Sequence, residues 1–441
     1  MSHTHLNFSG LVLRTFAAVV GASPFALAQT YVPIPAPCPI ARGAFGSAVD
    51  LLDFNGDGSL DIAIGSSGHD AVFIYYGPSF LVWQAIDSTG ILPPGVCPAA
   101  PTGTLMGASL ASRAVDLVAG DELAIGAPGA SVGASAGAGV AYLAGGGVGL
   151  LTVASASPQT GASMGTSVAL GDFDADGRID LAAGAPETNV SGTCSPVATE
   201  GRVHVFRNSF AVETLIDNPR AGQAGACNGW FGVDMATGDT DSDGLDDLFV
   251  SSEANPVGAI ANAGAIYRYG GAVIGAGGVV TTPLEIVDPV PLSCDPGARF
   301  SKSIDVRGSL LIAGAPRKDL PNTCSRVDIG ATFAFPGPGF SGSLLPPAGL
   351  TALLGFRVVL ADRVGSAAAD VIGFSLSTNS LLIWDGTALG SAPIVVAGPT
   401  GGGAHWVYGV AAGQLIPGGV EEVVLGDPDF SGATGRVMIL Q

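Results

Sequence analysis

Short apolar runs recur along this chain, and glycine or proline closes most of them. An aromatic residue or methionine followed by glycine opens three similar segments: FGSAVDLL from Phe45, MGTSVALG from Met164 and FGVDMATG from Phe231. A second run ending in small residues follows each, as IAIGSS, LAAGAP and LFVSSE. A third, β-branched and aromatic, follows a variable loop as AVFIYYG, GRVHVFR and GAIYRYG. Apolar runs of this length between turn residues predict β-strands.

The same frame returns four more times, so the chain is a sevenfold repeat. The units begin near Phe45, Met106, Met164, Phe231, Phe300, Leu354 and Tyr408. The shortest spacing is 54 residues, from Phe300 to Leu354, and the longest is 69, from Phe231 to Phe300. Seven units of similar size indicate one architecture built by repetition.

The units before the last also contain a fourth, looser apolar run, such as LVWQAID in the first unit and AVETLID in the third. Four short antiparallel strands repeated seven times predict an all-β, seven-bladed β-propeller over residues 29–441, with a linear solenoid as the alternative. The seventh unit reaches Gln441 without a fourth run, and the extended segment QTYVPIPAP precedes the first unit. We expect this segment to supply the missing outer strand, because a closed ring leaves no free sheet edge.

Charge excludes some classes of partner. The 441 residues include 37 Asp and Glu but only 17 Lys and Arg, which gives a formal net charge of −20. Binding to nucleic acid or to anionic lipid surfaces requires cations that this chain lacks.

The first 28 residues have the pattern of a secretory signal. Arg14 precedes the apolar run TFAAVVGASPFALA, and Ala26-Leu27-Ala28 fits a cleavage site before Gln29. A membrane anchor or a buried segment is the alternative, but the run is short for a span of about 20 apolar residues. We expect a protein that is secreted or exposed at the cell surface, with the periplasm as another possible location.

Three stretches carry acidic residues at alternate positions: DFNGDGSLD from Asp53, DFDADGRID from Asp172 and DTDSDGLDD from Asp239. Alternate side chains in a tight loop can converge on one point, and a set of hard oxygen ligands suits Ca²⁺. The expected ligands are Asp53, Asn55, Asp57 and Asp61; Asp172, Asp174, Asp176 and Asp180; Asp239, Asp241, Asp243 and Asp247; and the backbone carbonyls of Ser59, Arg178 and Leu245.

The loops begin like an EF-hand but lack its Glu at position twelve, where Ile64, Ala183 and Val250 stand instead. A solvated acidic turn is the alternative interpretation. Three copies with identical spacing favour about three calcium sites, of which the first has one charge fewer because of Asn55. The other four units have lost the loop, and we expect no metal there.

These residues together resemble the FG-GAP repeat of integrin α-subunit propellers and of many exported microbial proteins. The resemblance extends from Phe45 to Gln441 and is weakest in the last two units. It implies a seven-bladed propeller with calcium in hairpins between the first two strands of a blade, on the bottom face.

In this topology all six cysteines belong to loops of the opposite, top face. An even number of cysteines in an exported chain suggests disulfides, and fifteen pairings are possible. Neighbourhood around the ring favours Cys38–Cys97, Cys194–Cys227 and Cys294–Cys324.

Three candidate ligand-binding residues, Trp230, His405 and Trp406, come just before innermost strands. The alternative is that they pack between blades, since tryptophan is mostly buried. The sequence contains no nucleophile elbow, zinc-protease motif or phosphate-cradling loop. We therefore expect a non-enzymatic binding or adhesion module for protein or glycan. The alternatives are a carbohydrate-active enzyme or lectin, or a structural component of a surface layer.

Overall fold

The computed structural model describes most of the chain from Thr30 onwards. The described residues are 30–38, 42–113, 120–145, 149–192, 194, 199–207, 209–223, 226–275, 280, 283–289, 297–319, 329–337, 339–345, 353–365, 368–376, 378–398, 407–416, 419–429 and 435–441. The expected signal segment 1–28, the candidate residues His405 and Trp406, and the cysteines Cys294 and Cys324 lie outside them.

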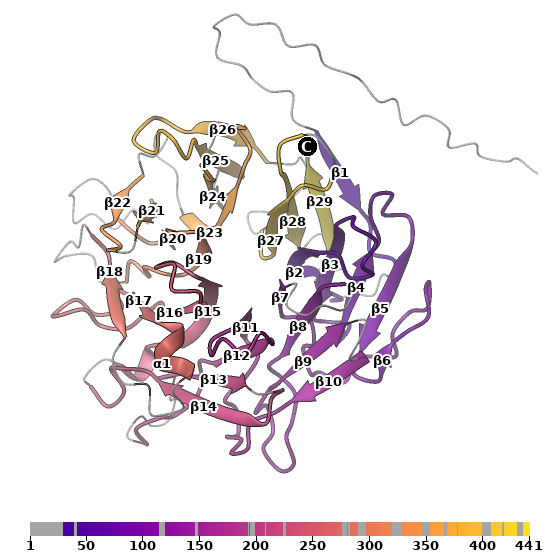
Figure 1. Cartoon of the computed structure of the whole chain (residues 1–441), viewed down its shortest axis with the longest axis horizontal. Helices are drawn as coiled ribbons and strands as arrows, with labels where there is room; N and C mark the ends of the chain where they lie inside the picture. Colours follow the sequence, from indigo (N-terminus) through magenta and orange to yellow (C-terminus); the bar gives the residue numbers. More distant parts are fainter. Residues whose placement is uncertain are drawn as a thin grey trace, which may run out of the picture.

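Seven antiparallel sheets form a ring around a central axis (Figure 1). Helical structure in the described residues is limited to α1 (Gly271–Gly275) and one 3₁₀ turn (Ala226–Asn228). The predicted seven-bladed propeller is therefore confirmed. Consecutive strands pair within each blade, so every blade is a meander that runs outward from the axis.

The strands of the first four blades match the predicted units. Blade 1 contains β2 (Phe45–Leu52), β3 (Asp61–Ser66), β4 (Ala71–Tyr75), β5 (Trp83–Asp87) and β6 (Gly90–Ile91). Blade 2 contains β7 (Ser109–Arg113), β8 (Glu122–Ala127), β9 (Val140–Gly145) and β10 (Gly149–Val153). Blade 3 contains β11 (Ser167–Gly171), β12 (Asp180–Ala185), β13 (Arg202–Arg207) and β14 (Val212–Asp217). Blade 4 contains β15 (Phe231–Gly238), β16 (Asp247–Ser252), β17 (Ala265–Tyr269) and β18 (Leu284–Val287).

The remaining blades follow the same order. Blade 5 contains β19 (Ile304–Arg307), β20 (Leu310–Ala315), β21 (Ala331–Pro336) and β22 (Ser343–Leu344). Blade 6 contains β23 (Leu354–Ala361), β24 (Asp370–Ser375), β25 (Ser380–Trp384) and β26 (Ile394–Ala397). Blade 7 contains β27 (Val410–Gly413), β28 (Glu422–Asp427), β29 (Arg436–Leu440) and, from the other end of the chain, β1 (Tyr31–Ile34).

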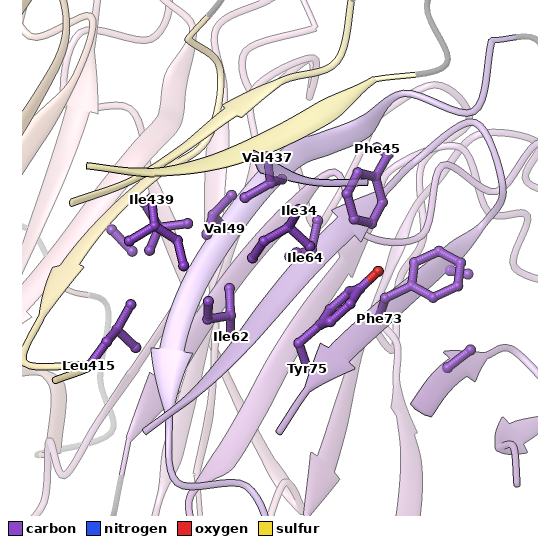
Figure 2. Packing of buried hydrophobic residues seen from close by; sticks show 14 of the residues in the cluster. Ile34, Phe45, Val49, Ile62, Ile64, Phe73, Tyr75, Leu415, Val437 and Ile439 are labelled. Carbon is purple, nitrogen blue, oxygen red and sulfur yellow. The ribbon is translucent and has the colours of Figure 1, made fainter. Parts of the chain in front are cut away.

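The ring closes as expected. Strand β1 pairs antiparallel with β29, with Tyr31 opposite Leu440 and Ile34 opposite Val437. Figure 1 shows β1 beside the C-terminus. In Figure 2, Ile34 and Val437 lie close to Phe45 of blade 1, within one buried cluster shared by blades 7 and 1.

The core lies between blades. Among the described residues, buried apolar side chains form seven clusters, and each cluster joins two neighbouring blades. Strand β24 illustrates the cause: Val371 packs toward blade 5, and the next residue, Ile372, packs toward blade 7. Because successive side chains point to opposite faces, and both faces of each middle strand are covered, these strands are apolar at nearly every position.

Close backbone contacts also join the blades. The residue that opens the third strand of each blade has a positive φ angle: Asp70, Gly139, Gly201, Gly264, Gly330, Asn379 and Gly435. At the five glycines an added Cβ would lie only 2.1 to 2.3 Å from the backbone of the residue that opens the next blade. We call these blade-opening residues the anchors. They are Phe45, Met106, Met164, Phe231, Phe300, Leu354 and, in blade 7, Val407.

Blade 7 differs from the sequence expectation by one residue. Val407 is 1% exposed and belongs to the cluster between blades 6 and 7, whereas Tyr408 is 37% exposed. The Tyr408 N–H donates to the Gly426 carbonyl as the Gly107 N–H does to Gly126 in blade 2, so Tyr408 occupies the position of the glycine. Tyr408 is thus available on the channel side, and the apolar anchor is the valine before it.

The close contact at Gly201 generates a stability prediction. We expect Gly201→Ala to destabilise the protein by about 3 kcal/mol or more, because φ is +91° and the Cβ would lie 2.2 Å from the Phe231 carbonyl oxygen. The matched control is Gly192→Ala, with φ of +70° but no atom within 4 Å, which should cost only about 1 kcal/mol. Urea unfolding measures both, and equal losses would contradict the close-contact explanation.

Candidate functional site

The three acidic loops all lie where the innermost strand of a blade ends, and we call this side of the ring the bottom face. Loop one (53–61) joins β2 to β3, loop three (172–180) joins β11 to β12, and loop four (239–247) joins β15 to β16. The anchors and the loops from second to third strands lie on the other side, the top face. The predicted placement of the acidic loops is therefore observed.

Loop three brings its carboxylates together. Oxygens of Asp172, Asp174 and Asp176 lie within 4.8 Å of one another. The turn that does this is held by the Gly177 N–H, which donates to Asp172 Oδ2 at 3.1 Å, and by the Arg178 N–H, which donates to Asp176 Oδ1 at 2.9 Å. Asp172 Oδ1 is buried and has no hydrogen-bond partner.

The fourth acid of loop three lies beneath this group. Asp180 is fully buried, and its Oδ2 accepts the Phe173 N–H at 3.0 Å, while its Oδ1 has no hydrogen-bond partner. The pKa of Asp180 is raised to about 7. Burial is the largest cause, and the charges of Asp174, Asp176 and Asp172 contribute the rest of the increase. Two unpartnered buried carboxylate oxygens beside a group of acids fit a bound cation, because uncompensated buried charge is costly.

Loop four has the same group of acids but contains a cation of its own. Oxygens of Asp239, Asp241 and Asp243 lie within 4.8 Å of one another. The guanidinium of Arg268, on β17, contacts Asp241 and also donates to both oxygens of Asp247 at 2.8 Å. Loop three also has an arginine beside it, Arg207 on β13, but its Nη1 lies 3.4 Å from Asp174 Oδ2 and contacts neither Asp172 nor Asp180. Arg268 thus approaches the acids of loop four more closely than Arg207 approaches those of loop three.

Loop one carries less charge. Asn55 Nδ2 donates to Asp57 Oδ2 at 3.0 Å, and Asp53 accepts the Asp57 and Gly58 N–H groups. Both oxygens of Asp61 have donors, from the Phe54 N–H at 3.0 Å and the Gly77 N–H at 2.8 Å. Loop one therefore has fewer carboxylate oxygens without a hydrogen-bond partner than loop three has.

The residues after the turn glycine hold each loop in shape. Ser59, Arg178 and Leu245 each donate their backbone N–H to the third side chain of their loop, at 2.8 to 2.9 Å. Their carbonyl oxygens stay predicted ligands.

The acid at position nine has a wider role than the sequence suggests. In blade 6, Asp370 accepts the Arg363 N–H at 2.7 Å, and in blade 7, Glu422 accepts the Leu415 N–H at 2.8 Å, although neither blade has the acidic loop. This carboxylate therefore fastens the start of the hairpin to its end, with or without neighbouring acids.

Acidic doublets tie these hairpins to the next blade, and sequence reasoning missed them. The Asp172 N–H donates to Asp246 Oδ2 at 2.8 Å, and the Asp246 N–H donates back to the Asp172 carbonyl at 3.0 Å. Asp53 pairs with Asp121, and Asp362 with Glu421, in the same way. The signal was available: an acid directly precedes the position-nine acid in GDELAIG, LDDLFV and VEEVVLG.

The seven innermost strands line a central cavity of about 480 Å³. Four half-buried carboxylates line it: Asp50, Asp234, Asp305 and Glu421. Asp305 accepts the Val306 N–H of its own strand and the Leu360 N–H of the next blade, both at 2.8 Å. Burial raises the pKa of Asp50 and of Asp305 to about 6.

Two of the three expected disulfides are present. Cys38 bonds to Cys97, and Cys194 bonds to Cys227. Each joins loops of the top face, as predicted. The third expected pair, Cys294–Cys324, lies outside the described residues.

Trp230 directly precedes the anchor Phe231 and is half-buried, with a φ of +54°. Its N–H donates to the Thr199 carbonyl at 2.7 Å, so the backbone here is fixed. Its role in ligand binding stays a prediction.

Histidines in the described residues have framework contacts. His204 is buried and lies 2.7 Å from Glu213, and His69 Nδ1 lies 2.8 Å from Ser66 Oγ. Ser66 is fully buried and donates to the Gly43 carbonyl. Both side chains of this serine–histidine contact are therefore shielded from solvent.

Arg268 generates a prediction about metal affinity. We expect Arg268→Gln to strengthen calcium binding at loop four about tenfold, because the ion no longer displaces a charge-assisted contact. The control is Arg178→Gln, whose guanidinium donates to Ser209 and to no acid of loop three. Calorimetric titration with Ca²⁺ measures the affinity of wild type and of both variants. If Arg268→Gln bound Ca²⁺ no more tightly than wild type, competition by Arg268 would be contradicted.

The channel carboxylates generate a pH prediction. The pKa of Asp305 is higher in the folded protein than its ordinary value of 3.8, so its contribution to stability is present at low pH and is lost as pH rises through about 6. In chelator, wild type should therefore lose stability relative to Asp305→Asn between about pH 4 and pH 6, with little further change above that. The neutral control is Thr237→Val, and a pH-independent difference for Asp305→Asn would overturn the assignment.

Comparisons with known proteins agree with this geometry. The FG-GAP repeat family matches residues 45–79 and 164–206, which lie in blades 1 and 3. None of the curated proteins matches the sequence. Among solved structures, selenomethionine-substituted virginiamycin B lyase from Staphylococcus aureus is similar, with a TM-score of 0.52 at 8% identity, over 94% of this chain and 99% of that one.

The WD40 domain of Neurospora crassa Pan2 has a TM-score of 0.49 at 10% identity, over 93% of this chain and 95% of that one. At such identities the lyase shows the fold alone, and the Pan2 value is too low to add to it. The chain thus contains two segments that match the FG-GAP repeat, and it folds as a seven-bladed β-propeller.

Proposed function

We propose that this protein is an exported, calcium-stabilised propeller that acts as a non-enzymatic binding module for protein or glycan, outside the cell or at its surface. The observation that carries the calcium part is the pair of unpartnered buried oxygens on Asp172 and Asp180, beside the acids of loop three. Such a set of hard oxygen donors suits Ca²⁺, which takes six to eight of them.

In this proposal calcium stabilises hairpins and takes no part in chemistry. Loop three would hold the ion with Asp172, Asp174, Asp176 and Asp180, and the cation would neutralise acids that otherwise repel one another. Loops one and four would bind more weakly, since Asn55 removes a charge from one and Arg268 already neutralises the other.

Export is supported by the signal-like first 28 residues and by the two disulfides, because disulfides persist in oxidising compartments. Among the described residues, none of the helices is long and apolar enough to cross a membrane. The charge of −20 opposes binding to nucleic acid.

Ligand binding is assigned to the channel and the top face, because the acidic loops and blade-to-blade ties fill the bottom face. A carbohydrate-active enzyme or lectin is the second candidate, favoured by the carboxylates of Asp50 and Asp305 facing the cavity. Against catalysis, both oxygens of Asp305 already accept backbone N–H groups.

Calcium removal tests the stabilising role. We expect exhaustive chelation to lower the melting temperature, because an ion bound only to the folded state adds stability. The double variant Asp174→Asn, Asp176→Asn should melt lower in calcium and respond less to chelator, whereas Asp217→Asn on the outer strand β14 should respond like wild type. A melting curve that chelator leaves unchanged would sink the calcium proposal.

A glycan array and a pull-down from the cell surface test the binding role. Captured protein or glycan should be lost when bulky residues are introduced at the top of the channel, for example Ser47→Trp. Absence of any ligand in both experiments would instead favour a purely structural component.

A further inference from the structure

We propose that the top of the channel binds a small hydroxylated carboxylate, such as a hexuronate, with Arg357 as the residue that recognises the carboxylate. This inference rests on the proposed binding function and names the ligand class. It comes from an asymmetry at the top of the channel. Arg357 and Tyr408 line the cavity from blades 6 and 7, with Lys302 and Phe356 next to them, and mostly small side chains occupy the equivalent positions of the other blades.

Arg357 is the central residue. It lines the cavity from β23, and its Nε donates to the Tyr408 carbonyl at 2.6 Å, which fixes the guanidinium in place. In the described part of the chain, none of the carboxylates lies within ion-pair distance of it. Its terminal nitrogens therefore remain able to receive a carboxylate, which arginine binds through two parallel hydrogen bonds.

Further positive charge lies beside Arg357. Lys302 Nζ and Arg299 Nη1 share one carboxylate, that of Glu253, at 3.1 and 3.4 Å. Asp234 is a second acid near these cations: burial raises its pKa, and the charges of Arg357 and Lys302 oppose that shift. Asp234 also faces the cavity, but its oxygens accept the Met235 and Ile304 N–H groups at 3.1 and 3.0 Å. In a chain with only 17 Lys and Arg, this concentration of cations marks an anion-binding wall.

Two aromatic rings lie beside Arg357. Phe356 and Tyr408 pack edge to face with centroids 6.0 Å apart, and the charged ends of Lys302 and Arg357 each lie 6.0 Å from the Phe356 centroid. Tyr408 is exposed because it stands where other blades have glycine or serine. An aromatic ring next to a guanidinium suits a ligand with an apolar face beside its carboxylate, as the pyranose ring of a sugar acid provides.

The rest of the channel leaves room for the ligand. Counting from the anchors, the positions equivalent to Arg357 hold Ala48, Ser109, Ser167, Asp234, Ser303 and Val410. All are smaller than arginine, so the space opposite the wall is open. A cavity of about 480 Å³ is within the usual range for small-molecule sites.

The interior of the channel sets the orientation of the ligand. Asp50 and Asp305 are each five residues past their anchors, and Arg357 is three past its own, so the two acids lie about 7 Å deeper at the usual strand rise. They can accept hydrogen bonds from hydroxyl groups but repel a second carboxylate. The ligand carboxylate is therefore placed at Arg357 and its hydroxyls toward Asp50 and Asp305.

Calorimetric titration with three matched sugars tests the charge requirement. We expect the full protein, in calcium, to bind D-glucuronate and to bind D-glucose and D-glucosamine at least about tenfold more weakly, since only glucuronate offers a carboxylate to Arg357. Tighter binding of glucosamine would show that the acids of the channel dominate and would overturn the proposal.

Variants test the assigned residue. Arg357→Gln should weaken glucuronate binding about tenfold or more, whereas Arg202→Gln, which removes an arginine paired with Asp217 on the outer strands, should leave it unchanged. Melting curves of both variants confirm folding. Equal binding by wild type and a folded Arg357→Gln variant would exclude Arg357 as the recognition residue.

Two further probes separate the sources of the ligand. An oligoglucuronate that binds much more tightly than the monosaccharide indicates the end of an acidic polysaccharide, and equal affinity indicates a free sugar acid. Capture of neutral glycans or of an acidic peptide, without glucuronate binding, would refute this inference and leave the binding function standing. If none of these ligands bound, both this inference and the proposed binding function would be wrong.

Discussion

The close approach of one blade to the next is the constraint on which the rest of the structure depends. A residue with positive φ opens the third strand of every blade, and at five blades this residue is a glycine against the next anchor. Because the backbones touch there, the faces of neighbouring sheets are held at a fixed distance, and the seven apolar clusters fill the space between them. Asp70 and Asn379 provide the same conformation where glycine is absent, since short polar side chains tolerate it.

Much of this arrangement could be predicted from the sequence. Strand order, blade number, ring closure, the position of the acidic loops and two disulfides follow from repeated apolar runs and from neighbourhood in a ring. The start of blade 7 was displaced by one residue because YG has the form of the other openings, and only burial distinguishes Val407 from Tyr408. Local pattern finds an element, but it cannot decide between adjacent residues that both fit it.

The sites depend on contacts between distant residues, and pattern reasoning fails there for a physical reason. Loops three and four have nearly the same acids, yet Arg268 changes the electrostatics of one of them from a neighbouring strand. The wall formed by Lys302, Phe356, Arg357 and Tyr408 likewise assembles from three blades. Neither arrangement can be predicted from the sequence of a single repeat, because each depends on residues from different strands or blades that become neighbours only in the folded ring.

Closure by β1 has a consequence for how the molecule is connected. The Gln441 N–H donates to the Thr30 carbonyl at 3.2 Å, so the first and last described residues are neighbours. Blade 7 alone is built from both ends of the described chain, and the disulfide at Cys38 fastens the segment after β1 to blade 1. The ring therefore has no intrinsic beginning: a circularly permuted chain, joined at blade 7 and opened in a loop between two other blades, could keep every strand pairing described here.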